Sequence, residues 1–225
     1  MTKTLLLTGS TGEIGAAIFN KFQKNNFEII APSRAEMDLS DVASINSFML
    51  TLKNPIDVFI HCAGFNSPKP VGELLHEDVE KTMQVNTFSF YDIIFHLLPQ
   101  FKANKNAYVL GVSSMYGSFS RQKRLAYSAS KHALNGMIKT LALELGRYNI
   151  KVNGIAPGFV DTKMTHKNNS EAVIEAFKQK IPLGNLAHAN DIANACYFLC
   201  SPENGYINGE ILTIDGGYSI GGFEK

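Results

Sequence analysis

Tryptophan is absent from the 225-residue sequence, cysteine occurs only three times, and the formal net charge is only +1. Cys62, Cys196 and Cys200 are odd in number and contain no Cys-x-x-Cys pair, so they indicate neither a disulfide framework nor a zinc site. The histidines lack the spacing of metal ligands as well. We therefore expect no metal site and a reducing, cytoplasmic location. The balanced charge gives no support to nucleic-acid binding, which usually needs a basic excess.

Long apolar segments are also missing. No apolar run approaches the about 20 residues that span a bilayer, and three consecutive leucines near the N-terminus are too few for a signal peptide. We therefore expect no association with membranes. Hydrophobic residues still make up 45% of the chain, which is enough for a substantial core. No linker, repeat or change of composition divides the chain, which predicts a single domain over residues 1–225.

Short apolar runs alternate with longer amphipathic stretches along the whole chain. This alternation predicts an α/β protein with a doubly wound, Rossmann-type parallel sheet and helices on both faces. A polar loop is expected between the strand that ends at 158 and the helix that begins at 171. The strands are expected at 4–9, 27–33, 56–64, 107–114, 150–158 and 210–217, and the helices at 12–26, 38–52, 76–101, 125–146, 171–180 and 190–200.

A glycine-rich turn, "TGSTGEIG" at 8–15, directly follows the first strand and opens the first helix. Glycines at 9, 12 and 15 permit a tight turn and the close approach of a pyrophosphate, which the unpaired N–H groups of the helix N-terminus would bind. The alternative is a tight strand–helix turn that binds no ligand. The position in the first βα unit favours a dinucleotide site.

The end of the second strand is where such a fold distinguishes NAD from NADP. Here Ser33 and Arg34 come first, and a hydroxyl beside a guanidinium suits the 2′-phosphate of NADP. Glu36 could instead bind a ribose, or could pair with Arg34. NADP(H) is therefore favoured, with NAD(H) as the alternative.

Tyr127 and Lys131 are four residues apart at the start of a predicted helix, so they share one face of it. Such a pair alone is usually a surface contact. It could also be a device for proton transfer, because a neighbouring cation favours the phenolate and lowers a tyrosine pKa from its usual value near 10. We therefore expect Lys131 to lower the pKa of Tyr127.

With the glycine turn, the Tyr-x-x-x-Lys pair and "DGG" at 215–217, the chain resembles the classical short-chain dehydrogenase/reductase family over essentially its whole length. The resemblance implies an oxidoreductase that works as a homo-oligomer, a dimer or tetramer. The implied catalytic residues are Asn86, Ser114, Tyr127 and Lys131, with Ser113 as the rival for the serine role. The implied cofactor-binding residues are Gly9, Ser10, Thr11, Gly12, Glu13, Ile14, Ser33, Arg34, Asp38, Leu39, Cys62, Ala63, Gly64, Tyr127, Lys131, Pro157, Val160 and Thr162.

The family's mechanism implies a role for each catalytic residue. Tyr127 would give its proton to the substrate carbonyl oxygen as hydride arrives from NADPH. Ser114 would hydrogen-bond that oxygen, and Lys131 would hold the nicotinamide ribose. Asn86 would hold a water that connects Lys131 to solvent.

The chain departs from the family pattern in two of its motifs. Glu13 stands where the family has a glycine. His61 and Cys62 replace two asparagines of the third motif, so the hydrogen bonds that those asparagines would make are in question.

Three hypotheses about the substrate and the function remain open. Arg121, Lys123 and Arg124 form either a solvated basic loop or a site for an acidic substrate or carrier. The C-terminal third is similar to 3-oxoacyl-[acyl-carrier-protein] reductases, which ranks a 3-oxoacyl thioester first. Another ketone, such as a sugar derivative, is the second hypothesis, and a non-catalytic dinucleotide sensor is the third.

Overall fold

The computed structural model describes residues 2–104 and 106–222. Its centre is a sheet of six strands in the order β2-β1-β3-β4-β5-β6, and every neighbouring pair is parallel. This confirms the predicted fold class. The strands are β1 (Thr4–Thr8), β2 (Glu28–Ile30), β3 (Val58–His61), β4 (Ala107–Val112), β5 (Ile150–Pro157) and β6 (Ile211–Ile214).

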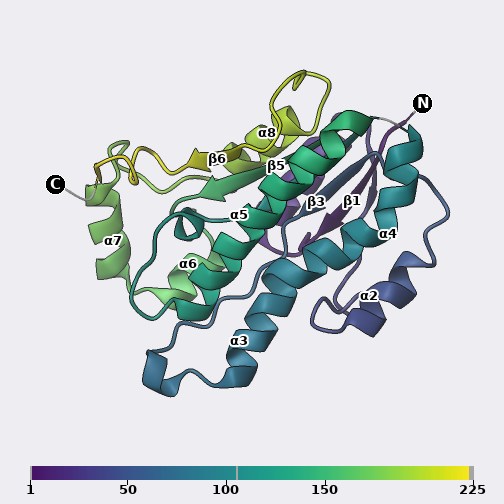
Figure 1. Ribbon diagram of the computed structural model, residues 1–225. Helices are drawn as coiled ribbons and strands as arrows, with labels where there is room; N and C mark the ends of the chain where they lie inside the picture. The colour runs from purple at the N-terminus through teal and green to yellow at the C-terminus, as the bar shows by residue number, and fades with distance from the viewer. Residues whose placement is uncertain (1, 105, 223–225) are drawn as a thin grey trace.

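Helices cover both faces of the sheet (Figure 1). The helices α2, α4 and α5 pack on one face, and α1 and α8 pack on the other. Their bounds are α1 (Glu13–Gln23), α2 (Val42–Met49), α3 (His76–Met83), α4 (Ser89–Asn104), α5 (Leu125–Leu145), α6 (Lys163–Asn168), α7 (Glu171–Lys180) and α8 (Ala189–Leu199). Three short 3-10 turns lie at Val71–Glu73, Met115–Gly117 and Gly146–Tyr148.

The two faces of the sheet carry separate hydrophobic cores because successive side chains of a strand point to opposite sides. In β1, Leu6 packs with α2, α4 and α5, whereas Leu5 and Leu7 pack with α1 and α8. All residues of β1 are buried, as expected for a strand covered on both faces. Cys196 and Cys200 belong to the α1–α8 core and are buried, as small apolar residues would be.

Three local features differ from the sequence prediction. The polar segment after β5 contains α6, which Thr162 caps by accepting a hydrogen bond from the Thr165 N–H at 3.3 Å. The long helix expected at 76–101 is α3 and α4 joined by a π-helical turn at Gln84–Phe88. The strands β2, β3, β4 and β6 are each shorter than predicted by two or three residues at one end at least, and β1 and β5 each end one residue early. Asp41 caps α2 by accepting a hydrogen bond from the Ala43 N–H at 2.9 Å.

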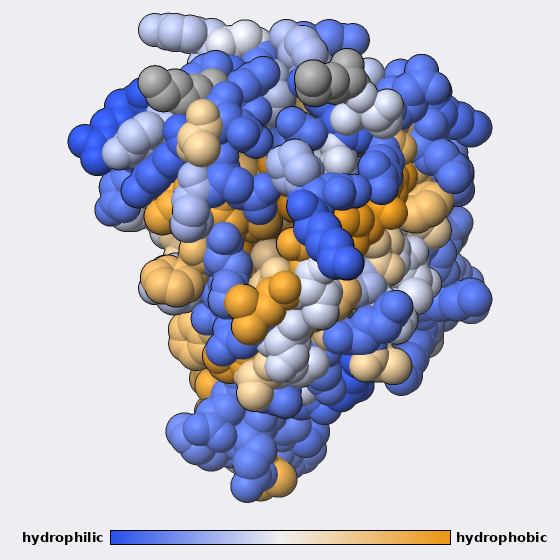
Figure 2. Space-filling view, turned by 90° about the vertical axis from the view of Figure 1, so that its right-hand side faces the viewer, coloured by the Kyte–Doolittle hydropathy of each residue, from blue (hydrophilic) through white to orange (hydrophobic). Residues whose placement is uncertain are grey.

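The order of the strands reverses direction beside β1, because the chain runs from β1 to β2 on one side and then crosses to β3 on the other. At such a switch point the loops after neighbouring strands separate and leave a crevice at the carboxyl end of the sheet. The glycine-rich turn follows β1 at this point. Figure 2 shows another side of the molecule, the one that carries α2 and the end of α4, where apolar side chains reach the surface between hydrophilic ones.

Candidate active site

A cavity of about 510 Å³ lies at the carboxyl end of the sheet. Segments that follow β1, β2, β3, β4 and β5 line it, together with the starts of α5 and α6. Of the predicted catalytic residues, Ser114, Tyr127 and Lys131 line the cavity. Asn86 is not in the lining but hydrogen-bonds the backbone of Phe65, which is. The predicted cofactor residues in its lining are Gly9, Ser10, Thr11, Gly12, Glu13, Ile14, Ser33, Arg34, Asp38, Leu39, Cys62, Ala63, Gly64, Tyr127, Lys131, Pro157, Val160 and Thr162.

The glycine turn can fold this tightly only because side chains are missing at Gly9 and Gly15. Gly9 has a φ of +74°, and a Cβ there would come within 2.6 Å of the Ala63 nitrogen. A Cβ on Gly15 would collide with the carbonyl of Gly9. Gly12 has open space on its cavity side and is the N-cap of α1 without a side-chain cap, so the first N–H groups of α1 are not bound by a capping side chain. These features fit a dinucleotide pyrophosphate at the N-terminus of α1.

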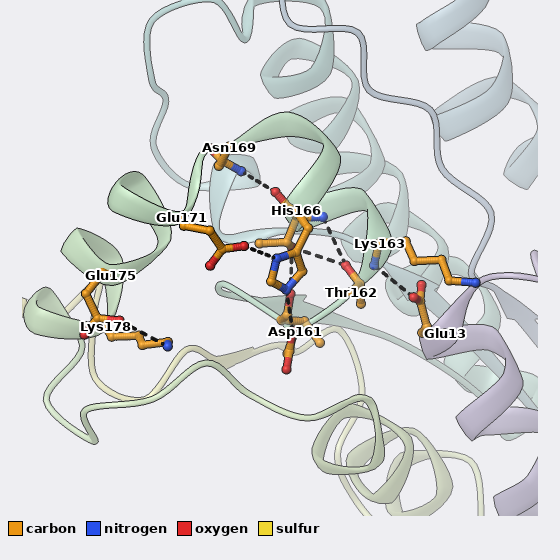
Figure 3. A network of polar contacts seen from close by, with 11 residues as sticks. Glu13, Asp161, Thr162, Lys163, His166, Asn169, Glu171, Glu175 and Lys178 are labelled. Atoms are coloured by element: carbon orange, nitrogen blue, oxygen red, sulfur yellow. Dashed lines mark hydrogen bonds and ion pairs between the residues drawn. The ribbon is translucent and has the colours of Figure 1, made fainter.

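Glu13, which departs from the family pattern, connects this turn to α6. Its Oε1 accepts a hydrogen bond of 2.9 Å from the backbone N–H of Lys163, the first residue of α6 (Figure 3). The glycine of the family pattern could not make this contact. Glu13 therefore holds α6 against the cofactor turn.

At the end of β2, the two residues predicted to bind a 2′-phosphate already have carboxylate partners. The Ser33 N–H and hydroxyl both donate to Glu36 Oε2 at 2.8 Å. Arg34 donates to Asp38 Oδ2 through Nε at 3.2 Å and through Nη2 at 3.1 Å. Glu36 therefore binds Ser33 and not Arg34, which corrects one of the predicted alternatives. The side chain of Arg34 is still 73% exposed at the rim of the cavity.

The side chains of Tyr127, Lys131 and Ser114 come from α5 and from the end of β4. Lys131 is buried, and its Nζ donates a 2.8 Å hydrogen bond to the carbonyl of Val112. The same Nζ lies 5.7 Å from the centre of the Tyr127 ring. Ser114 hydrogen-bonds the Tyr127 side chain and also accepts from the Tyr116 N–H at 3.2 Å. Ser113 also lines the cavity, and its hydroxyl has no hydrogen-bond partner among the described residues.

The protonation of this group corrects one expectation. Burial raises the pKa of Tyr127, although the hydrogen bond from Ser114 acts in the opposite direction. Burial lowers the pKa of Lys131 to about 8. The prediction that Lys131 lowers the pKa of Tyr127 is therefore wrong in direction, because removal from water disfavours the phenolate more than neighbouring groups favour it.

Asn86 is fully buried in the π-helical turn. Its Oδ1 accepts from the Phe65 N–H at 2.7 Å, and its Nδ2 donates to the Phe65 carbonyl at 2.9 Å and to the Ser130 hydroxyl at 3.0 Å. The amide thus holds the loop after β3 against α5, the helix that carries Tyr127 and Lys131. Its predicted contact with a water stays a prediction.

His61, which stands where the family pattern has an asparagine, makes hydrogen bonds through both of its ring nitrogens. Because a carbonyl only accepts, its Nε2–H donates to Val85 at 3.2 Å, which leaves Nδ1 to accept from the Thr8 hydroxyl at 3.0 Å. Thr8 in turn accepts from the Ala63 N–H at 3.3 Å. Burial lowers the pKa of His61 to about 3, so it stays neutral and links β1, β3 and the π-helical turn.

Several cavity residues could not be found from the sequence. Met164 and Asn168 come from α6, which has no apolar periodicity to reveal it, and Asn169 follows that helix. Phe65 and Asn66 follow the third motif. Arg121 and Arg124 of the basic loop also line the cavity. Within residues 2–104 and 106–222, no three histidine, cysteine, aspartate or glutamate side chains lie together as metal ligands would. No helix in that part of the chain is both long and apolar enough to cross a bilayer.

Known proteins are similar to this chain in sequence and in fold. A family model described as enoyl-(acyl carrier protein) reductase matches residues 13–219. The 3-oxoacyl-[acyl-carrier-protein] reductase FabG of Rickettsia felis is 30% identical over 232 residues, which cover 96% of each chain. The 7alpha-hydroxysteroid dehydrogenase of Escherichia coli (strain K12) is 31% identical over 183 residues, 81% of this chain and 70% of that one. A structure of 4-hydroxyisoleucine dehydrogenase complexed with NADH is 27% identical with a TM-score of 0.93, and covers 98% of this chain and 100% of that chain.

Proposed function

Because the chain belongs to the short-chain dehydrogenase/reductase family and is an oxidoreductase that uses a nicotinamide dinucleotide, we propose that it reduces a ketone to a secondary alcohol with NADP(H). One observation carries this proposal: the cavity that the glycine turn lines is also lined by Ser114, Tyr127 and Lys131. The alternative of a non-catalytic sensor is set aside, because the relatives reported above are dehydrogenases and reductases and these three side chains are present.

Each side chain has one task in this proposal. The bound cofactor supplies the hydride. Ser114 donates a hydrogen bond to the carbonyl oxygen, where negative charge develops. Tyr127 transfers its phenolic proton to that oxygen as general acid. Lys131 adds a buried positive charge beside Ser114 and Tyr127. Asn86 fixes α5, the helix that carries Tyr127 and Lys131. The raised pKa of Tyr127 supports this role, since the phenol keeps its proton at neutral pH.

An assay of NADPH oxidation tests the reaction. The wild-type protein should oxidise NADPH in the presence of a small panel of ketones, and Tyr127→Phe should lower kcat by about a hundredfold or more, as expected for the loss of a general acid. Fluorescence titration should show that Tyr127→Phe still binds NADPH. Turnover that is equal in the wild type and the variant would reject the proposed role of Tyr127.

By sequence similarity alone, the 3-oxoacyl thioester ranks first among the substrates. The similarity to FabG over 96% of both chains supports it, and the description of the family model likewise names an acyl carrier protein. Another ketone is the second choice, and the similarity to a hydroxysteroid dehydrogenase and to 4-hydroxyisoleucine dehydrogenase supports it. Acetoacetyl thioesters belong in the panel for the first choice, and a keto sugar and a keto steroid for the second.

For the cofactor, we favour NADP(H) because Ser33 and Arg34 lie at the cavity rim where the adenosine ribose of a dinucleotide is placed by the family fold. A 2′-phosphate would replace the Asp38 carboxylate as the partner of Arg34.

The cofactor proposal predicts the effect of one substitution. Arg34→Ala should weaken NADPH binding about tenfold while NADH binding changes little, since a charged hydrogen bond to the phosphate is lost. Titrating both cofactors by fluorescence measures this, with Lys53→Ala, an exposed lysine outside the cavity lining, as control. A wild-type protein that prefers NADH would contradict the proposal.

We also infer that residues 1–225 act as one dinucleotide-binding domain and that the chain forms a homo-oligomer. Large apolar side chains on α4 and the turn before it are exposed, at 44% for Phe88, 51% for Tyr91 and 62% for Phe95. Aromatic residues of this kind are enriched in the buried centre of protein interfaces.

A further inference from the structure

Arg124 is the residue just before α5, three positions ahead of Tyr127, and it lines the cavity. Its exposed fraction is only 8%, which is unusual for an arginine. It lies close to the side chains of Tyr116 and Tyr127. The guanidinium is therefore at the part of the cavity where the proposed reaction takes place.

The buried guanidinium has no partner that neutralises it. Its Nε and Nη1 atoms are buried and make no hydrogen bond within the described part of the chain. No carboxylate among the described residues forms an ion pair with it. A buried charge without a partner is costly, and burial lowers the pKa of Arg124 accordingly.

A purely structural role does not account for this side chain. Although Arg124 precedes α5, its side chain makes no capping hydrogen bond; only its backbone carbonyl accepts, from the Ser128 N–H at 2.7 Å. Its neighbour Arg121, by contrast, stacks on the Phe177 ring at 5.0 Å and is exposed. Lys123, between them, is exposed and does not line the cavity.

The same cavity has other buried polar atoms without partners. The Oδ1 of Asn66 and the hydroxyl of Ser113 both belong to its lining. The two nitrogens of Arg124 and the Ser113 hydroxyl are donors that an anionic ligand would satisfy, whereas the Asn66 oxygen is an acceptor and needs a donor. An arginine is the side chain best suited to hold a planar carboxylate.

We propose that Arg124 binds a carboxylate of the substrate, so that the substrates are oxo acids with a free carboxylate a few bonds from the reacting carbonyl. This inference rests on the proposed function, because it takes the carbonyl beside Tyr127 as the reacting group. It favours the second substrate choice, another ketone, over the first, since a 3-oxoacyl thioester carries no charge at that place.

The test compares each oxo acid with its methyl ester, which keeps the carbonyl and removes the charge. Acetoacetate and levulinate serve with their methyl esters and with an acetoacetyl thioester. The wild type should show a kcat/KM at least about tenfold higher for one acid than for its ester, the effect of one hydrogen-bonded charge. Arg124→Met should abolish this ratio mainly by raising KM for the acid, as loss of ground-state binding does.

Two further variants keep the result interpretable. Arg124→Lys keeps the charge but not the planar donors and should retain part of the preference. Lys123→Gly removes one charge from the same segment at a residue whose φ of +65° glycine accepts, and it should leave the ratio unchanged. Fluorescence titration with NADPH shows whether each variant still folds and binds the cofactor.

A binding measurement separates this inference from the proposed reaction. Each acid and its ester is titrated into the NADPH-bound protein, with cofactor fluorescence as the signal and no need for turnover. Binding of an acid that depends on Arg124, without turnover of any ketone, would support the carboxylate site and reject the proposed reaction. An acid-to-ester ratio that is the same in the wild type and in Arg124→Met, or no binding of any acid, would overturn the inference.

Discussion

Tyr127 and Lys131 lie on one turn of α5, and burial moves their pKa values in opposite directions. It raises the pKa of Tyr127 and lowers that of Lys131 to about 8. Both shifts have one cause, because removal from water favours the neutral form of each group. The phenol therefore stays protonated at neutral pH, while the ammonium is the group whose charge changes first as the pH rises.

A pH profile of the reduction follows from these directions. Below about pH 8 Lys131 carries its charge and Tyr127 its proton, so kcat/KM should be constant there. Above that pH the ammonium is lost and kcat/KM should fall, by about tenfold for each pH unit if only the charged form is active. Initial rates of NADPH oxidation measure this, with NADPH affinity determined at each pH as control. A profile that stays flat well above pH 8 would show that the charge of Lys131 is not required.

The sequence predicts where these residues lie better than how they are protonated. Four-residue spacing on a helix is enough to place Tyr127 and Lys131 together. Their pKa values depend on how much of the surrounding protein excludes water, which no local pattern contains. The same limit applies at β2, where Ser33 and Arg34 are in the expected place but their pairing with Glu36 and Asp38 depends on the path of the turn.

The helix α6 has no buried residue and is held in place by polar contacts. Glu13 holds its first residue, and His166 connects it to its surroundings at both ring nitrogens (Figure 3). The Nε2 of His166 lies 2.8 Å from Asp161 Oδ1, and its Nδ1 lies 3.3 Å from Glu171 Oε1 at the start of α7. Hydrogen bonds to Asp161 and Glu171 raise the pKa of His166.

This arrangement predicts that α6 loosens as the pH rises. A raised folded-state pKa means that the stabilisation is fully present below the ordinary histidine pKa of about 6.5 and is lost as the pH rises through the higher folded value. Hydrogen exchange of residues 161–171, corrected for its intrinsic pH dependence, should become faster above that value. The effect should be small and weaken with salt, because the side chain is 44% exposed.

The matching variant is His166→Asn, which cannot take a proton and should exchange equally fast on both sides of that pH. His76→Asn serves as control, since His76 on α3 is 84% exposed and pairs only with Glu80 among the described residues. Equal pH dependence in the wild type and His166→Asn would refute the role of this bridge.

Elements with a strong repeat were predictable, and α6 was not. The strands β1, β3 and β4 are fully buried, so each reads as a largely apolar run. The residues of α6, by contrast, are all outside the buried core, so no apolar face marks it. The π-helical turn at Gln84–Phe88 was also not predicted, because it lies inside a continuous helical stretch that reads as one long helix.

For the whole molecule, the regular alternation of apolar runs and amphipathic stretches was sufficient to predict a doubly wound parallel sheet. Right-handed crossovers leave few other ways to connect parallel strands. Association with other copies is not contained in that pattern, since an apolar helix face can point to the core or to a partner. In α4 the structure separates core residues from surface residues: Phe90, Ile93 and Leu97 are buried, whereas Tyr91 and Phe95 are exposed.

The exposed residues of this region predict the surface that joins two copies. Phe88, Tyr91 and Phe95 follow each other at helical spacing and form one stripe. If this stripe is an interface, the double variant Tyr91→Lys with Phe95→Lys should place charges in its centre and shift the protein to a smaller species. Size exclusion with light scattering measures the mass, and Val71→Lys, a 75% exposed residue on a separate turn, is the control. A monomeric wild type, or a double variant of unchanged mass, would refute association through α4.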